Sequence, residues 1–425
     1  MITRVSIKNF KAIRDASVDL TPIHLLIGPN DSGKTSVLEA IAAICRSVDH
    51  DAPNSFLGRW EGRELVNSAA TEAQVEVGID LDIDSNASSY KIEATFPASG
   101  RDIRWKMATA GTADLNGIPI GDPQRTLRTE TEICGARFHR AGHVINVPHV
   151  QKTTVVSAPV LSAVAALNAN SAFEAIKRPE WQIAQQISEA VGGCWYLRWT
   201  ARNLALPTAL NPERRFQLEG NGFGLPTLID DLLNYDRESF SALEREFTQI
   251  FPHVRTIALV QQQGFNSAVD QSDETLTLQP SAGKQVVFRL KNTDRDLPAS
   301  QAAEGMLYIL GYLALMYLPQ PPRVLLIEEP ENGIHPNLVG GIVRILRRLV
   351  ERHPETQIVM TSHSPYLVDA FQPEEVTWCR RNESGDVVLT RLDTLPEVER
   401  SLSVFSLGEI WTGELEPVHS REDAQ

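Results

Sequence analysis

The sequence predicts an α/β fold, and three short apolar segments are the observations that predict it. Residues 23–27 read Ile-His-Leu-Leu-Ile, residues 324–327 read Val-Leu-Leu-Ile, and residues 357–361 read Gln-Ile-Val-Met-Thr. Short apolar runs of this kind, bounded by glycine, proline or charged residues, are typical of buried strands. The first run leads through a glycine-rich loop into residues 36–45, whose alanines and aliphatic residues are typical of a helix.

The loop between the first strand and this helix reads Gly28-Pro-Asn-Asp-Ser-Gly-Lys-Thr35 and fits the phosphate-binding pattern GxxxxGK[ST]. Glycines let the backbone wrap closely around phosphates, and successive N–H groups together with the helix N-terminus attract the anion. Lys34 adds a mobile positive charge for the β and γ phosphates. We therefore predict that the chain binds a nucleoside triphosphate through Gly28, Asn30, Asp31, Ser32, Gly33, Lys34, Thr35 and Ser36.

The other two strands are followed by polar residues, acidic after the second strand and a histidine after the third. Glu328-Glu329-Pro330 follows the second strand, and Ser362-His363-Ser364-Pro365 follows the third. This order of loop, acids and histidine resembles the ATPase heads of the ABC superfamily, and most closely the RecF, SMC and OLD-type branch of AAA-family ATPases. The opening Val5-Ser-Ile-Lys-Asn-Phe10 and residues 329–336, Glu-Pro-Glu-Asn-Gly-Ile-His-Pro, also resemble that branch. The resemblance implies a three-layer α/β head with a P-loop, an antiparallel β lobe and a compact helical insertion.

The same resemblance implies a role for each polar residue at the strand ends. Thr35 is expected to ligate Mg²⁺ through its hydroxyl, and Glu328 is expected to hold the same ion. Glu328 stands where aspartate is usual, so its extra methylene displaces the carboxylate and alters the geometry of the metal site. Glu329 is expected to act as the general base that polarises the attacking water. His363 resembles the switch histidine that contacts the γ-phosphate.

ABC heads also carry a signature motif at a helix N-terminus, which contacts the nucleotide bound by the other subunit. The matching place is Ala302-Ala303-Glu304-Gly305, at the start of a helix that runs toward Leu318. Gly305 fits the motif, whereas Ala303 stands where serine is usual, unless Ser300 takes that role. The resemblance thus implies a homodimer or higher even oligomer. Without the usual serine, either ATP hydrolysis is slow or other hydrogen-bond donors complete the site. Gln151 is a candidate for the glutamine loop by position alone.

Periodicity predicts the organisation of the rest of the chain. Apolar residues alternate strictly over residues 75–83, a second strand starts at Tyr90, and similar patterns recur near residues 103–105 and 138–147. A helical period follows, with a stripe of Phe240, Leu243, Phe247 and Ile250. No heptads are sustained, which excludes a long coiled coil. We expect four segments, which are residues 1–157 (first half of the head), 158–253 (helical insertion), 254–412 (second half) and 413–425 (polar tail).

Bulk properties exclude several classes of protein. The net charge of −14 argues against a broad nucleic-acid surface. The longest apolar stretch, residues 310–318, is too short to span a membrane, and the N-terminus has no signal core.

The cysteines are scattered, which favours free thiols and a cytoplasmic location. The histidines at 139, 143 and 149 are poorly spaced for zinc. Two basic clusters are either solvated surfaces or a local DNA groove: Arg344, Arg347 and Arg348; and Arg380 and Arg381.

Taken together, these observations predict an ATP hydrolase that requires Mg²⁺ and works as a nucleotide-sandwich dimer. The first hypothesis is the ATPase subunit of a bacterial multi-component system of OLD type, such as phage defence. The stretch after His363 is too short for a nuclease domain of the TOPRIM type, so the effector nuclease is expected on a separate chain. The alternatives are a RecF-like DNA repair ATPase, an ABC transporter ATP-binding subunit and a nucleotide-gated scaffold that hydrolyses ATP slowly.

Overall fold

A computed structural model describes residues 1–50, 52–58, 60–96, 98, 104–111, 127–133, 179–210, 215–266 and 281–415. Its contacts divide the chain into two compact units. The first unit comprises Met1–Trp195, Pro322–Leu326 and Glu355–Gln425, and the second comprises Tyr196–Pro321 and Ile327–Pro354. One boundary falls within a predicted functional segment, because the strand that ends at Glu328 begins in the first unit and ends in the second.

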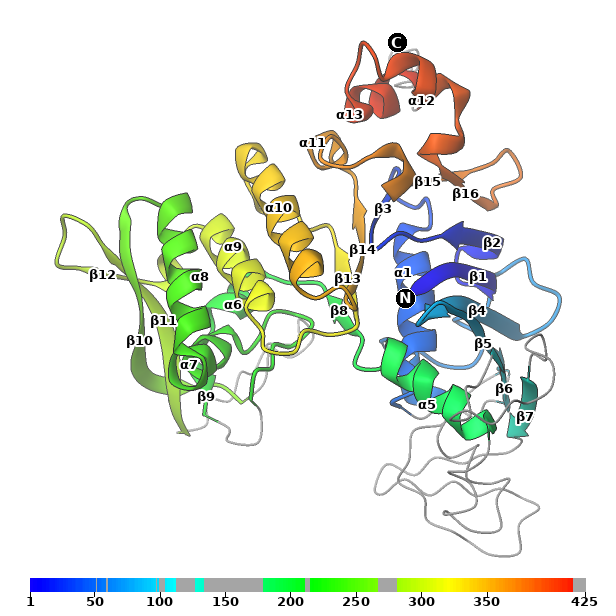
Figure 1. Ribbon diagram of the computed structural model, residues 1–425, viewed down its shortest axis with the longest axis horizontal. Coiled ribbons are helices and arrows are strands. Elements are labelled where there is room, and N and C mark those ends of the chain that lie inside the picture. The colour runs from blue at the N-terminus through cyan, green and yellow to red at the C-terminus, as the bar shows by residue number, and fades with distance from the viewer. Residues whose placement is uncertain are drawn as a thin grey trace, which may run out of the picture. The chain divides into compact units, whose positions relative to one another are not determined.

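An antiparallel sheet forms much of the first unit, with the strand order β2-β1-β4-β5-β6-β7 (Figure 1). Its strands are β1 (Ile2–Phe10), β2 (Ile13–Asp19), β4 (Gln74–Ile83), β5 (Asn86–Thr95), β6 (Arg104–Gly111) and β7 (Leu127–Ile133). Val75, Val77, Ile79 and Leu81 are buried on β4, so the alternation in the sequence marks a strand with one apolar face. The short helix α2 (Ala52–Ser55) and helix α5 (Pro179–Val191) belong to this unit, and α5 contacts β5, β6 and β7.

A second, mixed sheet carries the strands that the apolar segments predicted. In the first unit its order is β16-β15-β3-β14-β13, from β16 (Val387–Arg391), β15 (Val376–Arg381), β3 (Ile23–Ile27), β14 (Gln357–Ser362) and β13 (Val324–Glu328). Strand β3 lies parallel to both β14 and β15. All residues of β3 and β14 are buried, which explains their unbroken apolar character.

Helix α1 (Lys34–Arg46) follows the glycine-rich loop and contacts β1 and β4 of the antiparallel sheet and β14 of the mixed sheet. It is buried on nearly every side, which accounts for its small and aliphatic residues. Gln357 ties the two sheets together, since its side chain accepts from Ile2 N at 2.9 Å and donates to Ile2 O at 2.8 Å. The first unit is therefore layered as sheet, helix and sheet around α1.

The first unit closes with the chain after β14. Its elements are α11 (Pro365–Val368), η2 (Pro373–Glu375), β15, β16, η3 (Leu392–Thr394), α12 (Pro396–Ser401), α13 (Leu407–Ile410) and a π-helical turn at Trp411–Leu415. Helix α13 packs against α11, where Gly408 N donates to Asp369 Oδ1 at 2.7 Å. A Cβ at Gly408 would come within 2.4 Å of Pro365 O, so this contact requires glycine.

The second unit combines an antiparallel sheet with helices. The sheet contains β10 (Val254–Gly264), β11 (Ser281–Leu290) and β12 (Asp296–Pro298) in that order, with β9 (Thr208–Ala209) also paired to β11. The helices are α6 (Ala201–Ala205), α7 (Leu225–Tyr235), α8 (Arg237–Ile250), η1 (Ala299–Gln301), α9 (Glu304–Met316) and α10 (Pro336–Arg352), and β8 (Trp195–Leu197) enters this unit at Tyr196. Helix α9 contacts α6, α8 and α10, and its residues from Met306 onward are buried, which makes it the centre of the core (Figure 1).

Several further predictions can be compared with this fold. Phe240, Leu243 and Phe247 are buried on α8, as expected, whereas Ile250 at the end of the predicted stripe is half-buried. Cys45, Cys194 and Cys379 are free thiols, whereas Cys134 lies outside the described residues. The predicted strand at 138–147 and the start of the insertion at 158 also lie outside them, so the segment boundaries stay predictions. Among the helices that the structure describes, none is long and apolar enough to cross a bilayer.

Candidate nucleotide-binding site

The predicted phosphate-binding loop lies between β3 and α1, and its two glycines are required by the backbone. Gly28 has φ of 146° and Gly33 has φ of 93°. A Cβ at Gly28 would lie 2.2 Å from Cys379 O, and one at Gly33 would lie 2.9 Å from Val387 Cγ2. Gly33 is also the N-cap of α1, where no side chain covers the first N–H groups. The loop therefore brings backbone N–H groups and the positive end of a helix to one place.

The side chains of the loop differ in exposure. Lys34 is only 6% exposed, and its ammonium donates to Gly28 O at 2.6 Å and to Pro29 O at 2.8 Å. Asn30, Asp31 and Thr35 are exposed, whereas Ser32 and Ser36 are buried. The lysine charge is thus held inside the loop, and the Thr35 hydroxyl at the first turn of α1 is accessible to a cation.

Strands β15 and β16 brace this loop, which the sequence did not reveal. Arg381 Nε donates to Asp31 O at 2.9 Å, and its terminal nitrogen donates to Asp31 Oδ1 at 3.1 Å. Asp31 has a positive φ of 64°, a conformation that a non-glycine residue adopts at some cost. The ion pair with Arg381 holds that conformation. Its only sequence signal was the Arg380-Arg381 pair, which predicted a solvated surface or a DNA groove.

Two more of the predicted basic residues, Arg380 and Arg348, also have partners within the protein. Arg380 lies 5.0 Å from the centre of the Trp378 ring. In the second unit, Arg348 donates to Glu246 at 2.7 Å and 2.9 Å. This pairing raises the pKa of Arg348 and, against the opposing effect of desolvation, lowers the pKa of Glu246.

His363 follows β14 directly, and the register of the sheet places it at the edge where the loop begins. Ser362 of β14 is opposite Ile27 of β3, and the next residues are His363 and Gly28. His363 is exposed, and Ser364 N donates to Ser362 Oγ at 2.9 Å in the turn that follows. This position agrees with the predicted contact to a terminal phosphate, because both residues lie at the carboxyl ends of parallel strands.

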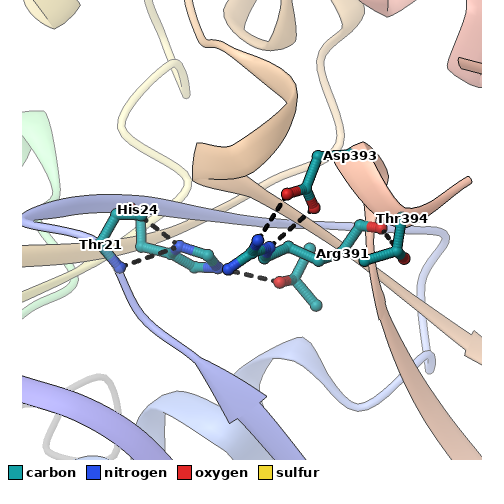
Figure 2. Close-up of polar contacts among 6 residues, drawn as sticks. Thr21, His24, Arg391, Asp393 and Thr394 are labelled. Carbon is teal, nitrogen blue, oxygen red and sulfur yellow. Dashed lines mark hydrogen bonds and ion pairs between the residues drawn. The ribbon is translucent and has the colours of Figure 1, made fainter. Parts of the chain in front are cut away.

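His24, on β3, is a buried histidine with a structural role (Figure 2). Thr21 lies beside its Nδ1, with Oγ1 at 3.1 Å and N at 3.4 Å, and its Nε2 shares a hydrogen bond of 2.9 Å with Thr377 Oγ1. Burial, and then the charge of Arg391, lower the pKa of His24 to about 3. Arg391 is itself paired with Asp393, as Figure 2 shows. His24 therefore stays neutral and supports the strand that leads to the loop.

In the second unit, the carboxylate of Glu328 is held at both oxygens. Tyr196 donates from its hydroxyl to Oε1 at 2.8 Å, and Arg198 Nε lies 3.1 Å from Oε2. The Glu328 side chain is 9% exposed, whereas that of Arg198 is 78% exposed. Neither partner was predicted, because both lie about 130 residues earlier in the chain. Glu328 is thus a largely buried carboxylate with a fixed orientation.

Glu329 differs from Glu328 in backbone and in partners. Its φ is 45°, the left-handed region that is unfavourable for a residue with a Cβ. Asn332 donates from its side chain to Glu329 Oε2 at 2.6 Å, and its N–H donates to Glu329 O at 3.0 Å. Strained residues of this kind concentrate at functional sites. The turn from Glu329 to Asn332 orients the carboxylate that the sequence predicted as general base.

The signature-like segment begins α9 as the sequence predicted. Ala303 is the N-cap, and it supplies no side-chain hydrogen bond to the helix. Gly305 is half-buried, and a Cβ there would have only ordinary contacts, at 3.9 Å from Gly333 O and 4.0 Å from Leu338. Gly333, with φ of 72°, lies against Glu304 and Tyr308 of the same helix. The structure therefore brings the turn after Glu329 next to the first turn of α9.

The predicted residues fall into two groups. The loop, Thr35 and His363 belong to the first unit, and Glu328, Glu329 and Gly305 belong to the second. The hydroxyl of Thr35 and the carboxylate of Glu328 are the oxygen donors that Mg²⁺ prefers, so both residues fit the predicted metal by their chemistry. No cluster of three or more potential metal-ligating residues of the histidine, cysteine or acidic types occurs within the described ranges. Gln151 and the histidines at 139, 143 and 149 lie outside those ranges.

Comparison with known proteins gives matches to ATPase families and to related proteins. Residues 1–129 match the family described as "AAA ATPase domain", and residues 208–369 match "AAA domain, putative AbiEii toxin, Type IV TA system". The chain is 22% identical over 401 residues to the OLD nuclease of Thermus scotoductus, which covers 92% of this chain and 64% of that protein. The SMC head crystallised with the C-terminal winged-helix domain of ScpA matches with a TM-score of 0.50 at 14% identity, over 92% of this chain and 99% of that one.

The chain resembles the ABC-type ATPase heads of the RecF, SMC and OLD branch. The resemblance stated from the sequence and the predicted fold class are both confirmed. A shorter match joins the chain to the DNA replication and repair protein RecF of Lactococcus lactis subsp. cremoris, at 29% identity over 93 residues, or 21% of this chain and 26% of that protein. The chain spans less than two-thirds of the length of either relative.

Proposed function

We propose that the protein binds ATP with Mg²⁺ and hydrolyses it. The observation that carries the proposal is the loop from Gly28 to Thr35, with its enclosed lysine and uncapped helix N-terminus. Lys34 places its charge on the β and γ phosphates, and the N–H groups of α1 bind the phosphate oxygens. His363 contacts the γ-phosphate from the neighbouring strand end.

The second group of residues supplies the chemistry of hydrolysis in this proposal. Glu329, oriented by Asn332, accepts a proton from the attacking water, a contribution worth about 10²–10⁴ in rate. Thr35 and Glu328 hold Mg²⁺, which when bound neutralises charge on the phosphates. Glu328 replaces the usual aspartate, and its carboxylate is fixed by Tyr196.

Substitution of the loop lysine tests ATP binding. Lys34→Ala removes charge-assisted hydrogen bonds worth about 1.5–3 kcal/mol each, so the affinity for ATP is expected to fall by about 100-fold or more. Isothermal titration calorimetry measures this loss. Lys8→Ala is a matched control, because Lys8 lies on β1 with a side chain that is 49% exposed. Affinity within a few-fold of the unmutated protein would refute the assignment of the loop.

We further propose that the head works as a dimer, with each nucleotide held between the loop of one copy and Gly305 of the other. Support comes from the first turn of α9, where Ala303 leaves the backbone N–H groups uncapped and Gly305 is partly accessible. Gly305→Asp is expected to prevent ATP-dependent dimers, because a carboxylate there repels phosphate. Gly305→Ala should still dimerise, since a Cβ has room. Both substitutions are made in the slowly hydrolysing variant Glu329→Gln, and light scattering in the presence of ATP measures the fraction of dimer. Equal dimer formation by Gly305→Asp and Gly305→Ala would contradict the proposal.

For the biological role, we propose the ATPase subunit of a bacterial defence system of OLD type, with the effector nuclease on another chain. The similarity to the relative named OLD nuclease supports this role. The carboxylates Glu328 and Glu329 are assigned to the nucleotide here and not to DNA cleavage. Purified protein incubated with plasmid, ATP and Mg²⁺ or Mn²⁺ is expected to hydrolyse ATP and leave the DNA intact. Cleavage that survives repurification would contradict the assignment.

A RecF-like repair ATPase is the second candidate, and the match to RecF over 93 residues favours it. The two roles predict different responses to DNA. A repair ATPase should bind duplex DNA and hydrolyse ATP several-fold faster when DNA is present. For the defence subunit, the acidic balance of the chain predicts weak binding that salt removes. Phosphate release with and without duplex DNA at two salt concentrations separates them.

A further inference from the structure

The contacts of Glu328 suggest that Arg198 and a bound cation compete for its carboxylate. One of its oxygens accepts a hydrogen bond from the Tyr196 hydroxyl at 2.8 Å, and the other lies 3.1 Å from Arg198 Nε in an ion pair. The two partners differ in charge. Tyr196 is neutral and orients the group, whereas Arg198 supplies a full positive charge.

The backbone around these partners is fixed, so only the arginine side chain is able to move easily. Arg198 N donates to Gly220 O at 2.7 Å, and Thr200 N donates to Asn221 O at 3.2 Å. The ring of Trp199 packs on that of Tyr312 of α9, with centres 4.8 Å apart. Beyond this anchored backbone, the Arg198 side chain is 78% exposed and loses little hydration or packing by turning into solvent.

The buried carboxylate, in contrast, needs a cation at all times. A carboxylate with a side chain only 9% exposed is costly to leave unpaired, and Arg198 provides the compensating charge. A divalent ion at the same carboxylate provides twice that charge. Two cations beside one carboxylate repel each other, so the ion and Arg198 favour different states of the site.

We propose that Arg198 is a resting counter-ion of Glu328 that Mg²⁺ must displace, while Tyr196 holds the carboxylate in both states. This inference rests on the proposed function, because it takes Glu328 as a residue that holds the ion. It makes Arg198 a residue that sets the concentration of divalent ion at which the head becomes loaded. If Arg198 only supported Glu328, its removal would weaken metal binding. As a competing cation, its removal strengthens metal binding.

The test is a titration with Mn²⁺ in the presence of a non-hydrolysable ATP analogue, with free Mn²⁺ measured by electron paramagnetic resonance. Arg198→Gln is expected to lower the apparent dissociation constant for Mn²⁺ by about 3- to 10-fold. Arg198→Lys keeps the charge and should stay within about 2-fold of the unmutated protein. Arg202→Gln is the matched control, because Arg202 is also exposed and lies four residues later, on α6.

The outcomes separate this inference from the proposed function. Binding of the analogue in EDTA should be equal in all four proteins, which confirms that the variants are folded and that the loop is intact. Unchanged or weaker Mn²⁺ binding by Arg198→Gln, with normal binding of the analogue, overturns the inference alone. An equal gain in Arg202→Gln also overturns it, since the effect would then be general electrostatics. Failure of the unmutated protein to bind the analogue refutes the proposed function, and the inference with it.

Discussion

The two groups of predicted site residues are held in place by different means. In the first unit, the phosphate-binding loop is defined by its own backbone, through Gly28 and Gly33 with positive φ and through Lys34 bonded to loop carbonyls. In the second unit, the carboxylates are oriented by other side chains, namely Tyr196 and Arg198 for Glu328 and Asn332 for Glu329. Geometry that comes from the backbone is difficult to adjust. Geometry that comes from side chains is able to respond to ligands.

This comparison predicts that changes in the second group alter turnover with little effect on nucleotide affinity. Glu329→Gln keeps the size of the side chain but removes the base, so hydrolysis should fall by about 10²–10⁴-fold. Affinity for ATP should stay within a few-fold. Phosphate release at saturating ATP, together with calorimetry, measures both quantities. Turnover at the unmutated level would show that Glu329 is not the base and would direct attention to Glu328.

The converse change affects the loop backbone and should reduce affinity. Gly28→Ala introduces a Cβ at 2.2 Å from Cys379 O, and alanine disfavours the φ of 146°. Strain of about 1–3 kcal/mol is expected to weaken ATP binding by about 10- to 100-fold. Gly340→Ala, within α10, is the control, because its Cβ meets only the end of Arg344. Normal ATP binding by Gly28→Ala would show that the backbone of the loop adapts to a Cβ and does not define the site.

The buried histidine below the loop makes the first unit sensitive to acid. Because the pKa of His24 is about 3 in the fold and about 6.5 in an unfolded chain, the unfolded state takes up the proton first as pH falls. Its stabilising contribution is therefore complete above pH 6.5 and declines between pH 6.5 and pH 3, by about 2 kcal/mol at pH 5. Urea unfolding at pH 7 and pH 5 should show a smaller loss for His24→Gln than for the unmutated protein. Equal losses would mean that His24 takes up its proton in the folded state at an ordinary pH.

The brace between Arg381 and the loop should have the smallest effect. Arg381→Ala removes two bonds to Asp31, but the pair is largely exposed and the glycines still define the loop. We expect ATP affinity to fall by about 3- to 10-fold, measured by calorimetry. Arg380→Ala, one residue earlier, should be neutral, because its guanidinium lies over the Trp378 ring. A loss as large as that of Gly28→Ala would show that the loop depends on its brace and not on its own backbone.

The difference between the two groups also explains what the sequence was able to predict. The loop, the strand ends and the start of α9 depend on neighbouring residues, and the pattern of residues 28–35, Glu328 and Gly305 therefore predicted their places. Tyr196, Arg198 and Arg381 bond to residues about 130 to 350 positions away, and no local pattern encodes such a pairing. The positive φ of Glu329 was likewise not predictable, because glutamate in a sequence gives no sign of a left-handed backbone.

That left-handed backbone has a consequence for resistance to heat. At position 329 the chain keeps a side chain with a Cβ where it costs about 1–2 kcal/mol. Asparagine tolerates this conformation better, so Glu329→Asn is expected to unfold at a higher temperature than the unmutated protein while losing turnover. Glu329→Gln keeps the strain and should melt at the unmutated temperature. In this protein the residue proposed to activate water would then be retained at the expense of thermal stability.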